Sequence, residues 1–503
     1  MYATAAKEHY FDMKKNDIIH MTITDCGVQG EGIGRFDGMP FFVPGAAIGD
    51  TITAGITKLK KTYGYARLIE VEQPSADRVE PPCPVASICG GCTLMHLSYE
   101  RQLSWKASVV ENALLRIGGV PQEVVSKAKQ AIIGMDKPLH YRNKSQYPVG
   151  RDRNGSIVIG FYAARSHRIV PIWGGSLSAE KKENGCLIAH PRDAEILPVV
   201  LKYMQENHVL PFDETTGEGL LRHILIRHAF SRQESMVCLV VNGNSLPNTQ
   251  KLCDRLSKIQ GVVSVVLNEN RRRDNVILGE KTRVLWGAQR IEDVLLGNHF
   301  SISARSFYQV NPVQTERIYR KAVEYAALTG SEIVWDLYCG IGTISLCMAA
   351  GARQVAGVEI VHDAVVDAKE NAEKIGIKNA SFFEGSAGEV AARFEKTDLA
   401  TPDVVVVDPP RKGLDEETIR LILSASPARL VYVSCNPSTL ARDIKEFRQG
   451  GFELVAYTPF DAFCFSGHVE TVVLMSRRNR RTGIVPWDTA FGGSQARRIY
   501  TAL

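Results

Sequence analysis

Five strand-like segments alternate with helical patterns from about residue 300 onward, and this regularity constrains the fold more than any other feature of the chain. The strand patterns are IVWDLYC, QVAGVEI, PDVVVVDPP, LVYVSC and VETVVLM. The helical patterns between them include SLCMAAGA, HDAVVDAKENAEKIG, DEETIRLILS and PSTLARDIKEFRQGG. Such alternation predicts an α/β domain with a doubly wound, mostly parallel sheet of the Rossmann-like kind.

The rest of the chain requires further domains, because 503 residues exceed what one hydrophobic core usually holds. Residues 15–75 alternate like short strands with Gly and Pro between them, which predicts a small β-barrel. Residues 76–300 mix helix-like and strand-like pieces, so we expect a central α+β domain. Residues 301–478 would then form the α/β domain, and residues 479–503 a basic, mobile tail.

The composition is that of an ordinary soluble protein, with 45% hydrophobic and 23% charged residues. No apolar run approaches the length that spans a membrane, and the N-terminal residues include no apolar signal-peptide stretch. We therefore expect a cytoplasmic protein without a membrane partner. We also expect a monomer.

Basic and aromatic residues gather in one segment of the expected barrel. The segment KLKKTYGYAR contains Lys58, Lys60, Lys61, Tyr63 and Tyr65. Small barrels with such a face commonly bind single-stranded nucleic acid. A strand-rich fold with an ordinary soluble rim is the alternative. The net charge of +5 permits a nucleic-acid partner without requiring one.

A glycine-containing turn follows the first strand of the α/β region, in DLYCGIGTISL. Gly340 and Gly342 would let the backbone approach a ligand beyond the carboxyl end of the strand. Glu359 closes the second strand, where an acidic residue can bind ribose hydroxyls. The third glycine of a dinucleotide fingerprint is missing. The loop instead looks like that of S-adenosylmethionine-dependent methyltransferases, with Asp336 opening it; a turn that serves only packing is the alternative.

Two further strand ends carry groups suited to chemistry. VVVVDPPRKGLD places Asp408 where it can contact cofactor or substrate. Arg411 stands where amino-directed methyltransferases have an aromatic ring, which weighs against amino methylation. The next strand ends at Cys435, in VYVSCNPSTLARD, and Glu470 begins a later strand. Taken alone, Cys435 would more simply be interpreted as a core residue, since free cysteine is often buried.

A thiol, a carboxylate and a methyl donor together suit methylation at carbon 5 of a pyrimidine. Carbon 5 is a poor nucleophile, but addition of a thiolate at carbon 6 converts the ring into an enolate that can attack the methyl group. A base must then remove the proton on carbon 5 so that the thiol is eliminated. The target base must be flipped out or already unpaired.

The motifs DLYCGIG, VDPPRKG, SCNPSTLARD and HVETVVL, in this order, resemble those of the RNA 5-methyluridine methyltransferases. The similarity continues upstream through YRNK, FYAARSHRIV, RHILIR and SFYQVN, and it covers roughly residues 15–475. The resemblance implies that Cys435 is the nucleophile and Glu470 the base. It also implies cofactor contacts for four residues, which are Gln309, Tyr338, Glu359 and Asp408.

Two positions depart from the family pattern. Thr343 stands where many members have Asn after the last glycine, so we assign no cofactor contact to it. The segment DAFCFSGHVE lacks the Pro and Thr that more often precede HVE, which leaves the role of Cys464 open.

Three of the eleven cysteines cluster in PPCPVASICGGCTLMH, namely Cys83, Cys89 and Cys92. The best candidate for a fourth ligand is Cys186, in the polar segment ENGCLIAHP. Four thiolates can hold zinc or an iron–sulfur cluster, and the spacing alone leaves both open. The family resemblance favours a [4Fe–4S] cluster in the central domain. Because the reaction needs no electron, we interpret the cluster as structural or as an aid to RNA binding.

The expected barrel resembles a TRAM domain, which is OB-like. A barrel together with a cysteine cluster resembles the 23S ribosomal-RNA branch of the family more than the transfer-RNA branch. We therefore expect an S-adenosylmethionine-dependent RNA (uracil-C5)-methyltransferase acting on ribosomal RNA. The alternatives are a transfer-RNA enzyme with the same chemistry and a non-catalytic RNA-binding protein, and the presence of both Cys435 and Glu470 speaks against the second.

Overall fold

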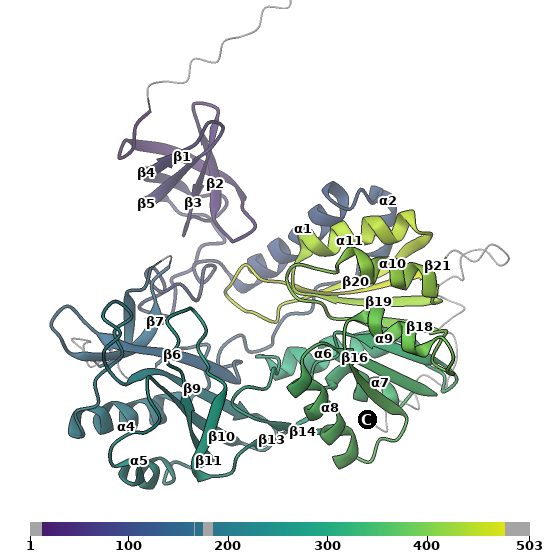
Figure 1. The fold of residues 1–503 in the computed structure, drawn as a ribbon. Helices are drawn as coiled ribbons and strands as arrows, with labels where there is room; N and C mark the ends of the chain where they lie inside the picture. Colours follow the sequence, from purple (N-terminus) through teal and green to yellow (C-terminus); the bar gives the residue numbers. More distant parts are fainter. Residues whose placement is uncertain (1–12, 165, 175–184, 478–503) are drawn as a thin grey trace, which may run out of the picture. The chain divides into compact units, whose positions relative to one another are not determined.

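The computed structural model describes residues 13–164, 166–174 and 185–477 (Figure 1). They divide into two compact units. Unit 1 comprises the described residues up to Lys106 together with Tyr162–His167 and Phe463–His468, and unit 2 comprises the rest. The tail predicted at residues 479–503 lies outside the described residues. Among the helices that are described, none combines the length and the apolar character needed to cross a membrane.

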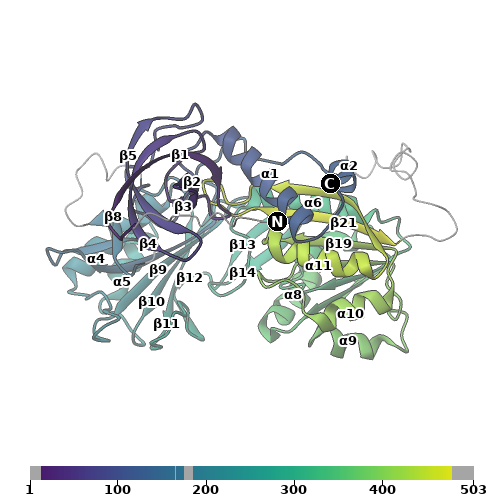
Figure 2. The same ribbon diagram turned by 90° about the horizontal axis from the view of Figure 1, so that it is seen from above.

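A closed barrel with the strand order β1-β2-β3-β5-β4 forms the N-terminal part of unit 1, drawn in purple in Figures 1 and 2. Inward-facing side chains alternate with outward-facing ones, as in β1, where Ile19, Met21 and Ile23 are buried. Gly64 pairs with Phe41, and a Cβ at Gly64 would lie 2.3 Å from the Phe41 ring, so only glycine fits. The predicted barrel is confirmed. Its strands are β1 (Ile18–Cys26), β2 (Gly32–Phe36), β3 (Met39–Val43), β4 (Thr51–Leu59) and β5 (Gly64–Gln73).

A seven-stranded sheet with the order β12-β11-β10-β9-β6-β7-β8 occupies the middle of the chain. Two helices, α4 (Asp193–Glu206) and α5 (Thr249–Leu256), contribute apolar residues to one core cluster with it, in agreement with the predicted α+β character. The strands are β6 (Lys144–Arg151), β7 (Ile157–Tyr162), β8 (Ile169–Gly174), β9 (Leu221–Ala229), β10 (Glu234–Val241), β11 (Val262–Glu269) and β12 (Lys281–Gly287). A separate hairpin, β13 (Ile291–Leu295) and β14 (Asn298–Ile302), follows.

The C-terminal sheet has the order β17-β16-β15-β18-β19-β21-β20, in which the first five strands are parallel, β21 is antiparallel to β19, and β20 is antiparallel to β21. This confirms the predicted Rossmann-like domain. The strand order reverses between β15 and β18, the place where open α/β sheets bind ligands. The strands are β15 (Ile333–Leu337), β16 (Gln354–Glu359), β17 (Ala380–Glu384), β18 (Val404–Val407), β19 (Arg429–Ser434), β20 (Phe452–Phe460) and β21 (Glu470–Arg477).

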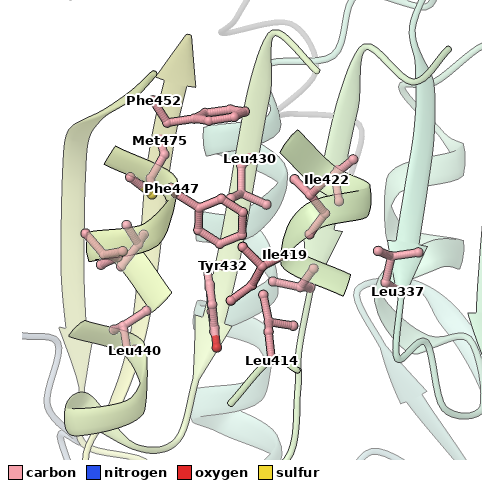
Figure 3. Close-up of a cluster of buried hydrophobic side chains, with 14 of the residues drawn as sticks. Leu337, Leu414, Ile419, Ile422, Leu430, Tyr432, Leu440, Phe447, Phe452 and Met475 are labelled. Atoms are coloured by element: carbon pink, nitrogen blue, oxygen red, sulfur yellow. The ribbon is translucent and has the colours of Figure 1, made fainter. Parts of the chain in front are cut away.

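Helices cover this sheet, and their apolar faces build its core. Figure 3 shows the Phe447 ring between Leu430 and Tyr432 of β19, with Phe452 and Met475 toward the top of the view. Two helices from the range predicted for the central domain also join this core, through residues such as Val110 and Val125. The helices are α1 (Tyr99–Arg116), α2 (Gln122–Ala128), α6 (Pro312–Ala326), α7 (Thr343–Ala349), α8 (His362–Lys374), α9 (Ala387–Phe394), α10 (Glu416–Ala425) and α11 (Pro437–Gln449).

Candidate active site

The parallel strands of the C-terminal sheet bring the predicted residues to one edge. Tyr338 directly follows β15, and Glu359 is the last residue of β16. Asp408 directly follows β18, and Cys435 directly follows β19. These four strands pair in parallel, so their carboxyl ends lie along the same edge of the sheet.

Glu470 reaches the same edge for a different reason. β21 runs antiparallel to β19, so it begins where β19 ends. The register pairs Ser434 with Thr471, and these two residues are the direct chain neighbours of Cys435 and Glu470. Glu470 is buried, with 6% of its surface exposed, and it interacts electrostatically with the Cys435 thiol.

The Cys435 thiol is protonated at neutral pH in this environment. Burial and, to a lesser extent, the carboxyl groups of Glu470 and Asp408 raise its pKa to about 11, against the opposing charge of the Arg411 guanidinium. The thiolate is the nucleophilic form of cysteine. Attack by Cys435 therefore requires that the thiol lose its proton as the new bond forms, or that a nearby cation lower the pKa.

The carboxyl groups beside the thiol titrate near neutral pH. Burial raises the pKa of Glu470 to about 8, with Asp408 adding to the rise and Arg411 opposing it. Burial also raises the pKa of Asp408 to about 7. A catalytic base works best when its pKa lies near the operating pH, so both carboxyl groups suit proton transfer.

The first turn of α11 holds the loop that carries Arg411. Asn436 caps this helix by accepting a hydrogen bond from the Ser438 amide. Its side-chain amide donates to the Arg411 carbonyl at 3.1 Å, and the Thr439 hydroxyl donates to the same oxygen at 3.3 Å. The residues just after Cys435 therefore fix the loop that follows Asp408.

Asp443, which the sequence analysis did not single out, completes this support from the second turn of α11. Its carboxylate is fully buried and accepts from the Leu414 amide at 2.9 Å and from the Tyr432 hydroxyl at 2.8 Å. Arg442 pairs with Asp443 and donates to the carbonyls of Lys412 and Leu414. The signal in the sequence was a run of polar residues, NPSTLARD, directly after the candidate nucleophile.

Glu359 joins the glycine turn to the next strand end. Its carboxylate accepts hydrogen bonds from the Gly340 amide at 3.1 Å and from the Val361 amide at 2.9 Å. Gly340 has a φ of +55°, and a Cβ there would meet nothing within 4 Å. At Gly342, by contrast, a Cβ would lie 2.8 Å from the Phe382 ring, so space beside the backbone of this turn is found at Gly340.

Asp336 is fully buried at the end of β15. One carboxylate oxygen accepts from the Ser345 hydroxyl at 2.5 Å, and the other has no hydrogen-bond partner in the described part of the chain. Burial and, to a lesser extent, the nearby Asp408 and Glu359 raise the pKa of Asp336 to about 7, against the hydrogen bond from Ser345, which lowers it. An unpartnered buried carboxylate oxygen beside the turn fits a site for a positively charged or hydrogen-bonding ligand.

Tyr338 and Thr343 make contacts within the protein. Tyr338 has a φ of +69°, and its hydroxyl lies 3.2 Å from the Thr418 hydroxyl at the start of α10. Thr343, at the position that departs from the family, shares a hydrogen bond of 3.0 Å with the buried Tyr319 hydroxyl. This bond gives Thr343 a structural role.

Gln309 lies on a separate segment ahead of α6, and the upstream motifs hold this segment. Asn143, from YRNK, donates to the Gln309 carbonyl at 2.8 Å. Arg227, from RHILIR, donates to the carbonyls of Ala304 and Ser306 and is itself buried. The described contacts of Gln309 thus fix its backbone, and they do not join its side chain to the other predicted cofactor residues.

The four predicted metal ligands are half-buried and lie in different units. Cys83, Cys89 and Cys92 belong to unit 1, and Cys186 belongs to unit 2. Across the described residues, no group of three or more His, Cys, Asp or Glu side chains is arranged so that it could hold a metal ion. The cluster therefore stays a prediction from the sequence.

Comparison with known proteins gives consistent matches over most of the chain. The family model of tRNA (uracil-5-)-methyltransferases matches residues 250–478, and that of the TRAM domain matches residues 14–69. A protein named as an RNA methyltransferase from Listeria innocua is 46% identical over 92% of this chain and 98% of its own. Another from Halalkalibacterium halodurans is 43% identical over 93% of this chain and 98% of its own.

One solved structure is similar over nearly the whole chain. It is the Pyrococcus abyssi tRNA (uracil-54, C5)-methyltransferase in complex with S-adenosyl-L-homocysteine. The TM-score is 0.71 at 26% sequence identity, and the match covers 91% of this chain and 100% of that one.

The raised pKa of the thiol gives a direct prediction for Cys435. Its alkylation by iodoacetamide should accelerate about tenfold per pH unit from pH 7 to pH 10 without a plateau, because only the thiolate reacts. Peptide-resolved mass spectrometry measures the rate at this cysteine alone. Arg411→Gln should slow the reaction, since the guanidinium lowers the thiol pKa. Lys412→Gln, the same loss of charge at the next position, is the control; a plateau near pH 8.5 would show that the thiol is not perturbed.

Proposed function

The chain belongs to the tRNA (uracil-5-)-methyltransferase family, and on this basis we propose that it methylates carbon 5 of a uridine in RNA, with S-adenosylmethionine as methyl donor and Cys435 as covalent nucleophile. The observation that carries the proposal is the antiparallel register of β19 and β21, which sets Cys435 beside Glu470. The carboxyl groups of Asp408 and Glu470, whose pKa values are raised to about 7 and about 8, support it together with Arg411.

The first step in this proposal is addition of the Cys435 sulfur to carbon 6 of the uracil ring. The thiol proton must leave as the bond forms, because the pKa of Cys435 lies near 11. In this proposal the Asp408 carboxylate, which also interacts with the thiol, accepts that proton, so that the Glu470 carboxylate remains unprotonated for the later step. The Arg411 charge favours both the thiolate and the negative charge that develops on the ring.

Bound S-adenosylmethionine supplies an electrophilic methyl group to carbon 5. We assign its binding to Gln309, Tyr338, Glu359 and Asp408, and the open turn at Gly340 and the unpartnered Asp336 oxygen fit a ligand at this edge. Glu470 then takes the proton from carbon 5, the bond between sulfur and carbon 6 breaks, and the double bond of the ring is restored. The raised pKa of Glu470 makes its carboxylate a stronger base than an exposed one.

We propose ribosomal RNA, specifically 23S, as the substrate. The barrel supports an RNA partner, because Phe42, Tyr63 and Tyr65 pack their rings with centroids 5.6–5.7 Å apart on its surface. Three exposed lysines lie nearby in the sequence. Lys58 is in β4, and Lys60 and Lys61 are in the turn between β4 and β5. Partly exposed rings beside lysines suit stacked bases and a phosphate backbone.

Transfer RNA is the second candidate substrate. The observation that favours it is the match to the Pyrococcus abyssi tRNA (uracil-54, C5)-methyltransferase, which extends over 91% of this chain.

The covalent mechanism predicts opposite behaviour for two variants. Cys435→Ala should form no complex with RNA that carries 5-fluorouridine, because the sulfur that attacks carbon 6 is gone. Glu470→Gln should add and methylate normally but accumulate a covalent complex with ordinary uridine, because the proton on carbon 5 stays. Denaturing gels with labelled RNA measure both. Cys464→Ala is the matched cysteine control and should behave as wild type in trapping; trapping by Cys435→Ala would remove this residue from the mechanism.

If ribosomal RNA is the substrate, it should be the RNA that receives the labelled methyl group. Wild-type protein incubated with labelled S-adenosylmethionine should methylate ribosomal RNA from cells that lack the protein, and nuclease digestion should yield 5-methyluridine. Transfer RNA from the same cells is the parallel pool. Label in transfer RNA alone would establish the second candidate, and binding of both pools without label would identify a non-catalytic RNA-binding protein.

We further propose that Cys83, Cys89, Cys92 and Cys186 bind a [4Fe–4S] cluster, which their number supports. Protein purified without oxygen should then be brown and contain about four iron atoms per chain. Cys186→Ser should lose the iron, whereas Cys253→Ser, at a buried position in α5, should keep it. Colourless protein that contains one zinc ion per chain would show that the same four cysteines bind zinc and not a [4Fe–4S] cluster.

A further inference from the structure

The connection between β20 and β21 leads directly into Glu470. Phe460, the last residue of β20, pairs with Glu470, the first residue of β21. Between them, Phe463–His468 belongs to unit 1, so its described contacts lie with that unit. Only Val469 separates this segment from the candidate base.

Phe465, in the middle of the segment, has a conformation that requires support. Its φ is +64°, in the left-handed region that bulky residues rarely adopt. Its amide donates to the Gln102 side-chain oxygen at 3.2 Å, and its carbonyl accepts from the Leu94 amide at 2.9 Å. Such a conformation persists only where the surroundings determine it, and it is most common near functional sites.

Two buried polar side chains of α1 provide much of this support. Gln102 is fully buried and also donates to the Leu97 carbonyl at 2.9 Å. Lys106 is fully buried and donates from Nζ to the Phe463 carbonyl at 3.0 Å. Burying a lysine is costly, so a lysine is a poor choice for a contact that serves only to fill space.

The same segment departs from the family pattern in sequence. Cys464 and Phe465 lie in DAFCFSGHVE, where Pro and Thr would be more usual. Both side chains are buried, and each meets Tyr99 at the start of α1. A connection that only had to close a hairpin would need neither a strained phenylalanine nor a buried ammonium group.

We propose that Gln102 and Lys106 are positioning residues for Glu470, which hold Phe463–His468 so that the carboxylate stays in place to remove the proton on carbon 5. The inference rests on the proposed function. It predicts that loss of either side chain impairs the last step of the reaction and spares the first, because the segment adjoins Glu470 in the chain and Cys435 is held separately by β19 and α11.

The test uses full-length Gln102→Leu and Lys106→Met, each compared with wild type and with Ser104→Ala. Ser104 lies on the same helix, is exposed, and bonds only locally, to the Arg101 carbonyl. Two rates are measured on RNAs of one sequence: covalent trapping of RNA that carries 5-fluorouridine, and release of methylated RNA from the covalent complex with ordinary uridine. We expect release at least about tenfold slower in both variants, with trapping within about twofold of wild type.

A second measurement separates positioning from general loss of structure. Adding Lys106→Met or Gln102→Leu to Glu470→Gln should cause no further slowing of release, because the group being positioned is already absent. Equal slowing of trapping and release, or unchanged release in either folded variant, would overturn the inference. If wild type forms no complex with 5-fluorouridine RNA, the proposed function fails, which is a different result.

Discussion

The antiparallel pairing of β21 with β19 is the constraint on which the candidate site depends. All other strands that contribute to the site are parallel, so they can offer only residues at their carboxyl ends. An inserted antiparallel strand offers its first residue at that same edge, and the pairing of Ser434 with Thr471 sets the thiol and the carboxylate side by side. A shift of one residue in this register would turn Glu470 to the other face of the sheet.

The motif that follows Cys435 extends to Asp443 because several of its side chains hold the loop after β18. Asn436 and Thr439 both donate to the Arg411 carbonyl, while Asp443 accepts from the Leu414 amide. These bonds tie the end of β18 to the start of α11, so Asp408 and Cys435 share one support. Hydrogen bonds to a buried carboxylate are among the stronger ones, which suits a loop that must keep a charge in place.

The sequence was sufficient to predict the parallel strands β15, β16, β18 and β19, because buried strands are nearly continuous apolar runs. It did not reveal β17 or β20, since ASFFE is short and FELVAYTPF contains a proline near its end. The packing of α2 on β20 was also missed, because local patterns do not show which distant sheet a helix covers. The roles of Asp443 and Lys106 depend on such long-range contacts as well.

Burial raises the pKa of both Cys435 and Glu470, which favours a mechanism in which the thiol loses its proton during the addition. It raises the pKa of Cys435, which lowers the fraction of thiolate but makes each thiolate a better nucleophile. It also raises the pKa of Glu470, which makes that carboxylate a better base. A site that relied on a preformed thiolate would instead surround the sulfur with positive charge. Here two carboxyl groups and one guanidinium act on the Cys435 thiol, so proton transfer has to accompany the addition.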